Sequence, residues 1–166
     1  MREAENLRAR IGLPPVSQIG ILVRDLDQTA RLYSEIFGIP EFYTYDLDVA
    51  NHWYYGEKAP VKLRMGKALW GQVEIELIQH VEGDKSLFPG WLAEHGEGLN
   101  HLGFEVDDYE HIHSRMVAEG FAPIQWIETD YPAYENGKAK ACYFDTRRVG
   151  GVIFEIMWRS WAKKSK

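Results

Sequence analysis

The chain has 166 residues, of which 45% are hydrophobic and 27% are charged, and its formal net charge at pH 7 is −6. A chain of this length and composition forms one compact domain or two small modules that share a core, and it is too short for a (β/α)₈ barrel. The acidic balance and the absence of a long basic run argue against a nucleic-acid partner, because phosphate binding needs clustered Lys and Arg.

The ends of the chain and its single cysteine indicate a protein of the cytoplasm. The first residues are charged and contain no apolar core of a signal peptide, and no stretch approaches the ~18 consecutive apolar residues of a membrane span. Cys142 can form no intramolecular disulfide, which fits a reducing compartment. We therefore expect a cytoplasmic protein with neither a membrane nor a nucleic acid as its partner.

Both ends are predicted to lie outside the main fold. Residues 1–15 form a helical lead-in, because the helical periodicity of Arg2–Ile11 ends at Gly12 and two prolines follow. Residues 161–166 form a short basic tail. The residues between these segments have to build the core.

Residues 16–88 are predicted to form a first module of one strand, one helix and three more strands. β-branched residues over 16–23 predict a buried strand. Asp25 and Gln28 form a capping-box pattern that opens a helix, and this helix ends at Gly38. The three strand candidates that follow are residues 42–47, 61–65 and 73–79.

Residues 89–160 are predicted to form a second module in the same order. Residues 101–106 form a strand, Asp107 and Glu110 repeat the capping box, and Gly120 closes the helix that follows. The remaining strand candidates are residues 123–129, 139–144 and 152–158.

The second module repeats the first in sequence as well as in pattern. Gln18-Ile-Gly-Ile aligns with His101-Leu-Gly-Phe, and Ile75-Glu-Leu aligns with Phe154-Glu-Ile, at offsets of 83 and 79 positions. The two βαβββ modules must pair, because neither alone can bury both faces of its sheet. Two strong internal helices beside about eight strands favour an α+β fold with largely antiparallel pairing over a parallel α/β sheet.

Four polar residues occupy equivalent strand positions in the two modules: Gln18, Glu76, His101 and Glu155. Each interrupts an apolar run, where a carboxylate is costly to bury unless it is paired or binds a metal. If a pseudo-two-fold axis relates the modules, the four side chains converge on one point of the concave face. An imidazole, two carboxylates and an amide oxygen form a mixed N/O set that suits a borderline divalent ion.

A purely structural interpretation of these residues stays open. Glu76 can belong to a solvated strand face with Glu74, and His101 can be an ordinary hydrogen-bonded histidine. Glu155 can pair with an arginine: Arg147, Arg148 or Arg159. The symmetric recurrence at four positions favours the metal site.

Three motifs carry a resemblance to a known superfamily. They are Gln18-Ile-Gly-Ile-Leu-Val-Arg-Asp-Leu, Tyr33-Ser-Glu-Ile-Phe-Gly38 and Gly98-Leu-Asn-His-Leu-Gly-Phe-Glu-Val-Asp-Asp108. Over residues 16–158 the chain resembles the vicinal oxygen chelate superfamily of glyoxalases, bleomycin-resistance proteins and dioxygenases. The resemblance implies paired βαβββ modules in a U-shaped open barrel around one divalent metal ion (Co, Ni, Zn, Mn or Fe), and a homodimer. The implied metal ligands are Gln18, Glu76, His101 and Glu155.

Within that superfamily the chain looks most like the methylmalonyl-CoA epimerase family. The matching stretches are Gly96-Glu-Gly-Leu-Asn-His-Leu-Gly-Phe-Glu-Val-Asp-Asp and Val73-Glu-Ile-Glu-Leu-Ile, although that family usually has His where this chain has Gln18. The resemblance implies a metal-dependent racemase or isomerase that removes a proton alpha to a carbonyl. The substrate would be a small molecule, with an acyl-CoA among the candidates, and Glu155 would be the base.

Epimerisation needs a second acid or base on the opposite face of the carbon, and Glu57 is the candidate. Its match to the epimerase family is loose because a predicted turn over residues 66–71 shifts the spacing, and an exposed loop position is the alternative interpretation. The aromatic stretches 52–55 and 131–134 are expected in loops, where they line a substrate pocket or cap the sheet.

Two other functions stay open. The ligand set is similar to that of eukaryotic glyoxalase I, a lactoylglutathione lyase, but Leu22 and His80 stand where that enzyme has its glutathione-binding Arg and an Asn. The extradiol dioxygenases of the superfamily bind iron with two His and one Glu. This chain has Gln18 in place of the first His, which argues against that activity. The second alternative is a metal-free small-molecule binding protein of the same fold, although such proteins typically lack the two carboxylates that this chain keeps.

Overall fold

Ten strands pair into one curled sheet in the computed structural model, which describes residues 2–130 and 137–160. The elements follow the chain as α1 (Arg2–Ile11), β1 (Gln18–Leu22), α2 (Leu26–Phe37), β2 (Tyr43–Val49), β3 (Asn51–Tyr54), β4 (Glu57–Lys58), β5 (Val61–Trp70), β6 (Val73–Glu82), α3 (Leu87–His95), β7 (Gly98–Glu105), α4 (Tyr109–Ala118), β8 (Pro123–Asp130), β9 (Lys138–Phe144) and β10 (Ile153–Ser160). The order across the sheet is β2-β5-β6-β1-β7-β10-β9-β8-β3-β4.

The two halves of the sheet share one connectivity. In each half the first strand runs parallel to the last, as β1 does to β6 and β7 does to β10. The other pairings of the described strands are antiparallel, including the β1–β7 pairing that joins the halves. The predicted α+β fold, a U-shaped open barrel built from two βαβββ units, is therefore confirmed.

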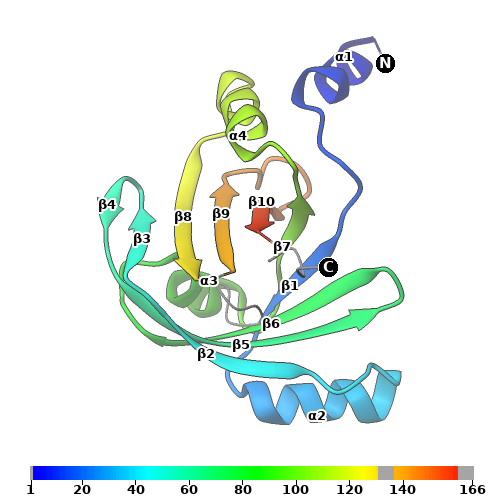
Figure 1. Cartoon of the computed structure of the whole chain (residues 1–166), viewed down its shortest axis with the longest axis vertical. Coiled ribbons are helices and arrows are strands. Elements are labelled where there is room, and N and C mark those ends of the chain that lie inside the picture. Colours follow the sequence, from blue (N-terminus) through cyan, green and yellow to red (C-terminus); the bar gives the residue numbers. More distant parts are fainter. Residues whose placement is uncertain (1, 131–136, 161–166) are drawn as a thin grey trace, which may run out of the picture.

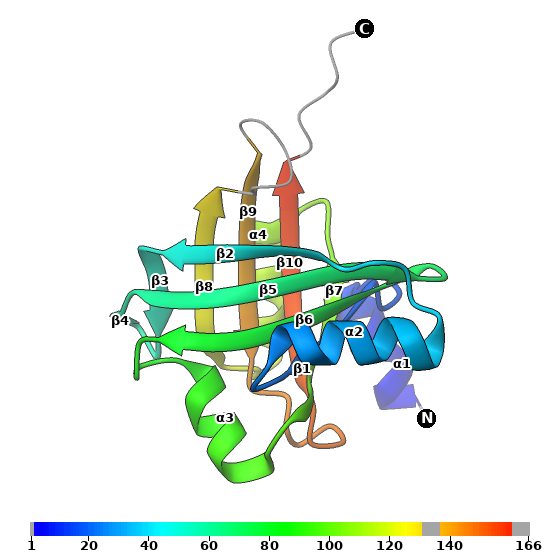
Figure 2. The ribbon, with the colours of Figure 1, turned by 90° about the horizontal axis from the view of Figure 1, so that it is seen from below.

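The halves face each other across the concave side of the sheet. Figure 2 shows β2, β5 and β6 crossing in front of β8, β9 and β10, with α2 on the outside, and Figure 1 shows the same strands curling around a common interior. A buried apolar cluster joins strands of both halves to α3 and includes Leu63, Phe88, Ile127 and Tyr143. Two further clusters contain side chains from α2 and from α1 and α4.

The helix ends follow the predicted signals, with one shift. The Asp25 side chain accepts a hydrogen bond of 2.9 Å from the Gln28 amide at the start of α2, as predicted. The cap of α4 is Asp108 rather than the predicted Asp107, because the Val106 amide still donates to Met157 of β10 and keeps the chain extended there. Among the described helices, none is both long and apolar enough to cross a membrane.

The hairpin of β5 and β6 is longer than predicted, and the expected turn over residues 66–71 is wrong. Gly66 lies inside β5 and pairs with Leu77, and the turn contains only residues 71–72, where Gly71 has a φ of 67°. Gly66 lies beneath α2, where an added Cβ would make ordinary van der Waals contact with Leu26 at 3.5 Å.

Three elements were not predicted. Residues 52–54 belong to β3 and not to a loop, and β3 with β4 forms a hairpin that pairs with β8 at the far end of the sheet. The helix α3 begins at a Ser86 cap and contains the expected boundary between residues 88 and 89. Pro89 and Gly90 are poor helix formers, so the sequence pattern did not predict this helix. A proline is tolerated in the first turn because the amide there would make no hydrogen bond within the helix.

Candidate metal centre and substrate cavity

Four neighbouring strands at the middle of the sheet bring the predicted ligands together. They are Gln18 on β1, Glu76 on β6, His101 on β7 and Glu155 on β10. Gly20 pairs with Glu76 on one side and with His101 on the other, and Gly103 pairs with Gln18 and with Glu155 in the same way. Residues paired side by side point to the same face of a sheet, so all four side chains share the concave face.

Each of the two glycines makes room for a ligand of the other half. A Cβ on Gly20 would lie 1.8 Å from Cε1 of His101, and a Cβ on Gly103 would lie 2.9 Å from Oε1 of Gln18 and 2.3 Å from Cε of Met157. No side chain fits at such distances without displacing the ligand. The repeated pattern of a ligand, an apolar residue and a glycine is therefore a packing requirement of the centre.

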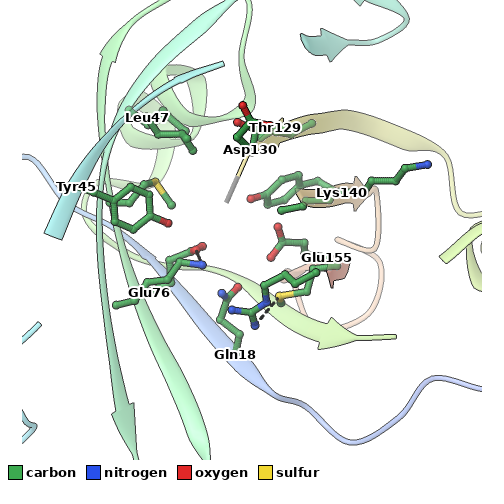
Figure 3. Close-up of a pocket in the computed structure, with 17 residues that line it drawn as sticks. Gln18, Tyr45, Leu47, Glu76, Thr129, Asp130, Lys140 and Glu155 are labelled. Carbon is green, nitrogen blue, oxygen red and sulfur yellow. Dashed lines mark hydrogen bonds and ion pairs between the residues drawn. The ribbon is translucent and has the colours of Figure 1, made fainter. Parts of the chain in front are cut away.

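Three oxygens converge on Nε2 of His101. The distances are 3.1 Å to Gln18 Oε1, 3.1 Å to Glu155 Oε2 and 3.5 Å to Glu76 Oε2. All four residues are buried, with at most 4% of their surface exposed. Figure 3 shows Gln18, Glu76 and Glu155 pointing toward one another from different walls of the cavity.

These donors fit a divalent metal ion. One imidazole nitrogen carries at most one proton, so it cannot satisfy three oxygens at once. Oε2 of Glu155 is buried and receives no well-directed hydrogen bond from the described residues. The donor atoms of Glu76, His101 and Glu155 lie within 4.8 Å of one another, and with Gln18 they form an N/O set typical of first-row divalent metals.

The negative charges of Glu76 and Glu155 also favour a cation at the centre. Burial alone would lower the pKa of His101, but the charges of Glu155 and Glu76 outweigh it and raise that pKa from 6.5 to about 9. Burial would raise the pKa of Glu76, but Lys67 and His101 lower it from 4.5 to about 2. Without a metal, the carboxylates thus hold a proton on the imidazole.

Asn100 sets the orientation of the His101 ring. It is the extra residue of a β-bulge between β1 and β7, where Gly20 pairs with His101 and the next residue pairs with Leu99. Because of the bulge, Oδ1 of Asn100 lies 3.1 Å from Nδ1 of His101. A neutral imidazole that donates its Nδ1–H to this oxygen presents the Nε2 lone pair to the centre.

Glu74 sets the orientation of the Gln18 amide. A carboxylate only accepts hydrogen bonds, so Nε2 of Gln18 donates to Oε1 of Glu74 at 2.7 Å and the amide oxygen is left facing the centre. Glu74 in turn accepts from Arg159 at 3.2 Å, and Arg159 reaches Glu105 at 3.1 Å. Arg159 is buried, so the two carboxylates compensate its charge.

The two carboxylate ligands have partners of their own. Nζ of Lys67 lies 2.9 Å from Oε1 of Glu76. Burial raises the pKa of Tyr143 well above its usual value and nearby Glu155 raises it further, so the phenol keeps its proton beside that carboxylate. The Tyr143 ring also packs at 86° to the His101 ring, with the centroids 5.2 Å apart.

A cavity opens above the centre. Its volume is about 70 Å³, and Gln18, Glu76 and Glu155 belong to its lining. Its walls are largely apolar and include Leu47, Leu63, Met65, Ile127, Ala141 and Met157. A concave, mostly apolar site with a few convergent polar groups is typical of small-molecule binding.

The other predicted residues that the structure describes do not line this cavity. Glu57 is exposed on β4, where its ion pair with Lys85 lowers its pKa, and it does not line the cavity. His52 is buried on β3 and contacts the Ala59 carbonyl. The second aromatic stretch, 131–134, lies outside the described residues.

Four residues of the centre were not predicted, and one of them left a signal in the sequence. These residues are Lys67, Glu74, Asn100 and Tyr143. Lys67 continues the inward alternation of Leu63 and Met65 along β5, where a charged residue is unexpected.

The comparisons with known proteins agree with this geometry. The family model described as Glyoxalase/Bleomycin resistance protein/Dioxygenase superfamily matches residues 17–143. No curated protein matches the chain in sequence.

The chain also resembles solved structures. A variant of Streptomyces coelicolor methylmalonyl-CoA epimerase in complex with 2-nitronate-propionyl-CoA is 21% identical, with a TM-score of 0.60 over 88% of this chain and 97% of that chain. Methylmalonyl-CoA epimerase from Mycobacterium tuberculosis is 18% identical, with a TM-score of 0.61 over 90% of each chain. A hypothetical protein from Bacillus halodurans C-125 is 16% identical, with a TM-score of 0.60 over 90% of this chain and 97% of that chain.

Identities this low establish a shared fold and leave the activity to the site itself. The family model, in contrast, spans both halves of the sheet and three of the four ligand positions. The chain therefore belongs to the glyoxalase/bleomycin resistance protein/dioxygenase superfamily.

Proposed function

We propose that this chain is a metal-dependent isomerase of the methylmalonyl-CoA epimerase kind, which removes a proton from the carbon alpha to a carbonyl. The observation that carries the proposal is the position of Glu155. Its buried carboxylate lines the cavity and lies 3.1 Å from the imidazole of the predicted metal ligand His101. Proton abstraction beside a carbonyl needs a base and a positive charge side by side at the reacting carbon.

Gln18, Glu76, His101 and Glu155 would hold the metal. A divalent ion bound there supplies a Lewis acid for the negative charge that develops on the carbonyl oxygen as the proton leaves. The protein prepares the place for it, because Asn100 and Glu74 each fix the donor atom of one ligand.

Glu155 would take the proton from the substrate. Tyr143 pairs with it across β9 and β10, which places a protonated phenol beside the carboxylate of the base. Met157 and Ala141 line the cavity nearby and exclude water from the reacting carbon. Glu57 has no role in this proposal, because it is exposed and outside the cavity lining.

The proposed substrate is a small molecule that chelates the metal, and an acyl-CoA thioester is our first candidate. The S. coelicolor epimerase of the same fold was solved with 2-nitronate-propionyl-CoA. The cavity here is not fully enclosed by the described residues, so the acyl group would enter while a long carrier stays outside.

The test is isotope exchange. The protein is stripped with a chelator, loaded with Co²⁺ and incubated with methylmalonyl-CoA in D₂O without glutathione, and deuterium at the alpha carbon is measured by mass spectrometry. We expect exchange by the loaded protein and none by Glu155→Gln. The control variant is Glu128→Gln, which changes an exposed carboxylate of β8 and should exchange normally.

Other outcomes would overturn the proposal. The Gln, Glu, His and Glu set also supports a lyase that acts on the hemithioacetal of methylglyoxal and glutathione, and turnover of that compound without exchange into the thioester would favour it. Leu22, where a glutathione-binding cation is expected, is fully buried in the core. A protein that binds no divalent metal would be a binding protein of this fold.

A further inference from the structure

Tyr45 lines the cavity from the wall that faces Glu155. It lies on β2 and pairs with Met65 of β5, which also belongs to the cavity lining, so the two side chains share the concave face. Tyr45 is half-buried and packs against the apolar cluster that includes Leu63 and Tyr143. Figure 3 shows the Tyr45 hydroxyl pointing into the cavity from the left and the Glu155 carboxylate pointing into it from the right.

These two groups lie on opposite walls because each half of the sheet supplies one of them. The strands β2, β5 and β6 form one wall, and β8, β9 and β10 form the other, as Figure 2 shows. The alpha carbon of a thioester becomes planar when it loses its proton, so inversion requires that a proton returns from the opposite face. A base on one wall therefore needs an acid on the other wall.

The wall opposite Glu155 has three groups in the described cavity lining that can transfer a proton: Tyr45, Lys67 and Glu76. Nζ of Lys67 lies 2.9 Å from Oε1 of Glu76, and Glu76 is a predicted metal ligand, so these two groups are committed to the centre. Tyr45 is not a predicted ligand. Its phenol can give a proton to a substrate without removing a donor atom from the metal.

We propose that Tyr45 is the catalytic acid that completes the epimerisation, on the face of the substrate opposite Glu155. Glu155 takes the alpha proton, and the electron pair of the broken carbon–hydrogen bond moves into the enolate. The phenol of Tyr45 gives its proton to the other face of the carbon, where the new carbon–hydrogen bond forms and a phenolate is left. Glu155 and Tyr45 then return to their starting states by proton exchange with water, because a carboxylic acid is a stronger acid than a phenol.

This inference rests on the proposed removal of the alpha proton by Glu155, and it adds the group that makes the reaction an inversion. The experiment follows the two epimers of methylmalonyl-CoA separately. Each is incubated in D₂O with the Co²⁺-loaded full chain, and mass spectrometry measures deuterium at the alpha carbon. A coupling enzyme that accepts only the opposite epimer measures inversion.

Wild type should invert both epimers. Tyr45→Phe should slow inversion in both directions by roughly 100-fold or more, since it has no proton to return from that wall. It should still exchange the alpha proton of the one epimer whose proton faces Glu155, with retention of configuration. A tyrosine with only a structural role would not separate exchange from inversion in this way.

Co²⁺ uptake, measured without substrate, should be the same in Tyr45→Phe and in wild type. Tyr45→Met repeats the test if the phenylalanine variant fails to fold. The matched control is Tyr43→Phe, which removes a hydroxyl from the same strand. The Tyr43 ring lies 5.3 Å from the Tyr45 ring, but it is half exposed and outside the cavity lining, so this variant should invert both epimers at the wild-type rate.

Three results would overturn the inference while leaving the proposed removal of the proton intact. The first is unchanged inversion in Tyr45→Phe. The second is an equal loss of exchange for both epimers in that variant, which would give Tyr45 a role in packing or substrate binding. The third is a wild-type chain that exchanges an epimer without inverting it. A wild-type chain that exchanges neither epimer would overturn the proposed function itself.

Discussion

Gly20 faces His101 across the antiparallel pair of β1 and β7, and a methyl group on Gly20 would overlap the imidazole ring. The same relationship holds between Gly103 and Gln18. Each half of the sheet thus provides two of the predicted ligands and the empty space for one predicted ligand of the other half. The centre exists only where the two halves meet.

Gly20→Ala should abolish the metal site. The added Cβ has to displace the His101 ring, and overpacking of this kind costs about 1–3 kcal/mol of stability in addition. Metal content after loading with Co²⁺ and the thermal midpoint would measure both effects. Gly66→Ala is the control, since its Cβ would make only ordinary contact with Leu26. Normal cobalt uptake by Gly20→Ala would contradict the packing argument.

Asn100→Ala should weaken metal binding while the fold is retained. The substitution removes the acceptor that lies 3.1 Å from Nδ1 of His101, and loss of such an outer partner typically costs about 10–100-fold in metal affinity. Competition with a chromophoric chelator would measure the affinity. Asn100→Asp keeps an acceptor at this position and should restore most of it. Equal affinities for wild type and Asn100→Ala would show that the bulge does not hold the ring.

Glu74→Met should destabilise the protein by about 2–3 kcal/mol, because Arg159 stays buried with only part of its charge compensated. Urea unfolding of the metal-free protein would measure the loss. Asp27→Asn removes the partner of Arg64 in an exposed ion pair and should leave the unfolding midpoint unchanged. If both variants behave alike, the Glu74–Arg159 pair has no special role in stability.

The stability of the metal-free protein should fall as the pH rises from 6.5 to 9. The folded chain raises the pKa of His101 to about 9, because Glu155 and Glu76 outweigh the opposing effect of burial. The bound proton therefore stabilises the fold fully below pH 6.5, and this contribution is lost as the pH passes about 9. Urea unfolding at a series of pH values would measure the slope.

The same proton competes with the metal, so metal affinity should increase over that pH range. His101→Gln is the control, because it has no titrating group and should lose the pH slope of stability. A slope that persists in His101→Gln would assign it to another group.

The sequence was sufficient to predict the main features of the fold and the four residues that converge at its centre. The helix α2 begins at the Asp25 cap and ends at Gly38, and both signals lie in its own local sequence, so neighbouring residues decide its ends. The four converging residues were recognisable because a polar residue inside an apolar strand is costly, and the repeat selected the positions that face one centre.

The unpredicted parts depend on pairing between distant residues. Asn100 reaches His101 only because β7 bulges against β1, and no local pattern encodes that register. Tyr143 is significant only because it lies opposite Glu155 across β9 and β10. The strand β3 is four residues long and is stabilised by β8, more than seventy positions away. Tertiary contacts decide such elements.

The passage of the chain from β2 to β3 has a consequence for how the protein can be divided. β2 ends the sheet on one side, and β3, which begins two residues later, covers the edge of β8 on the other side. A second half produced as a separate fragment would expose that edge, with its unpaired amide and carbonyl groups, to any strand in solution. β3 of the first half thus pairs with an edge of the second half that would otherwise be exposed. Because this pairing joins the two halves, we expect them to fold as one unit and not as separate fragments.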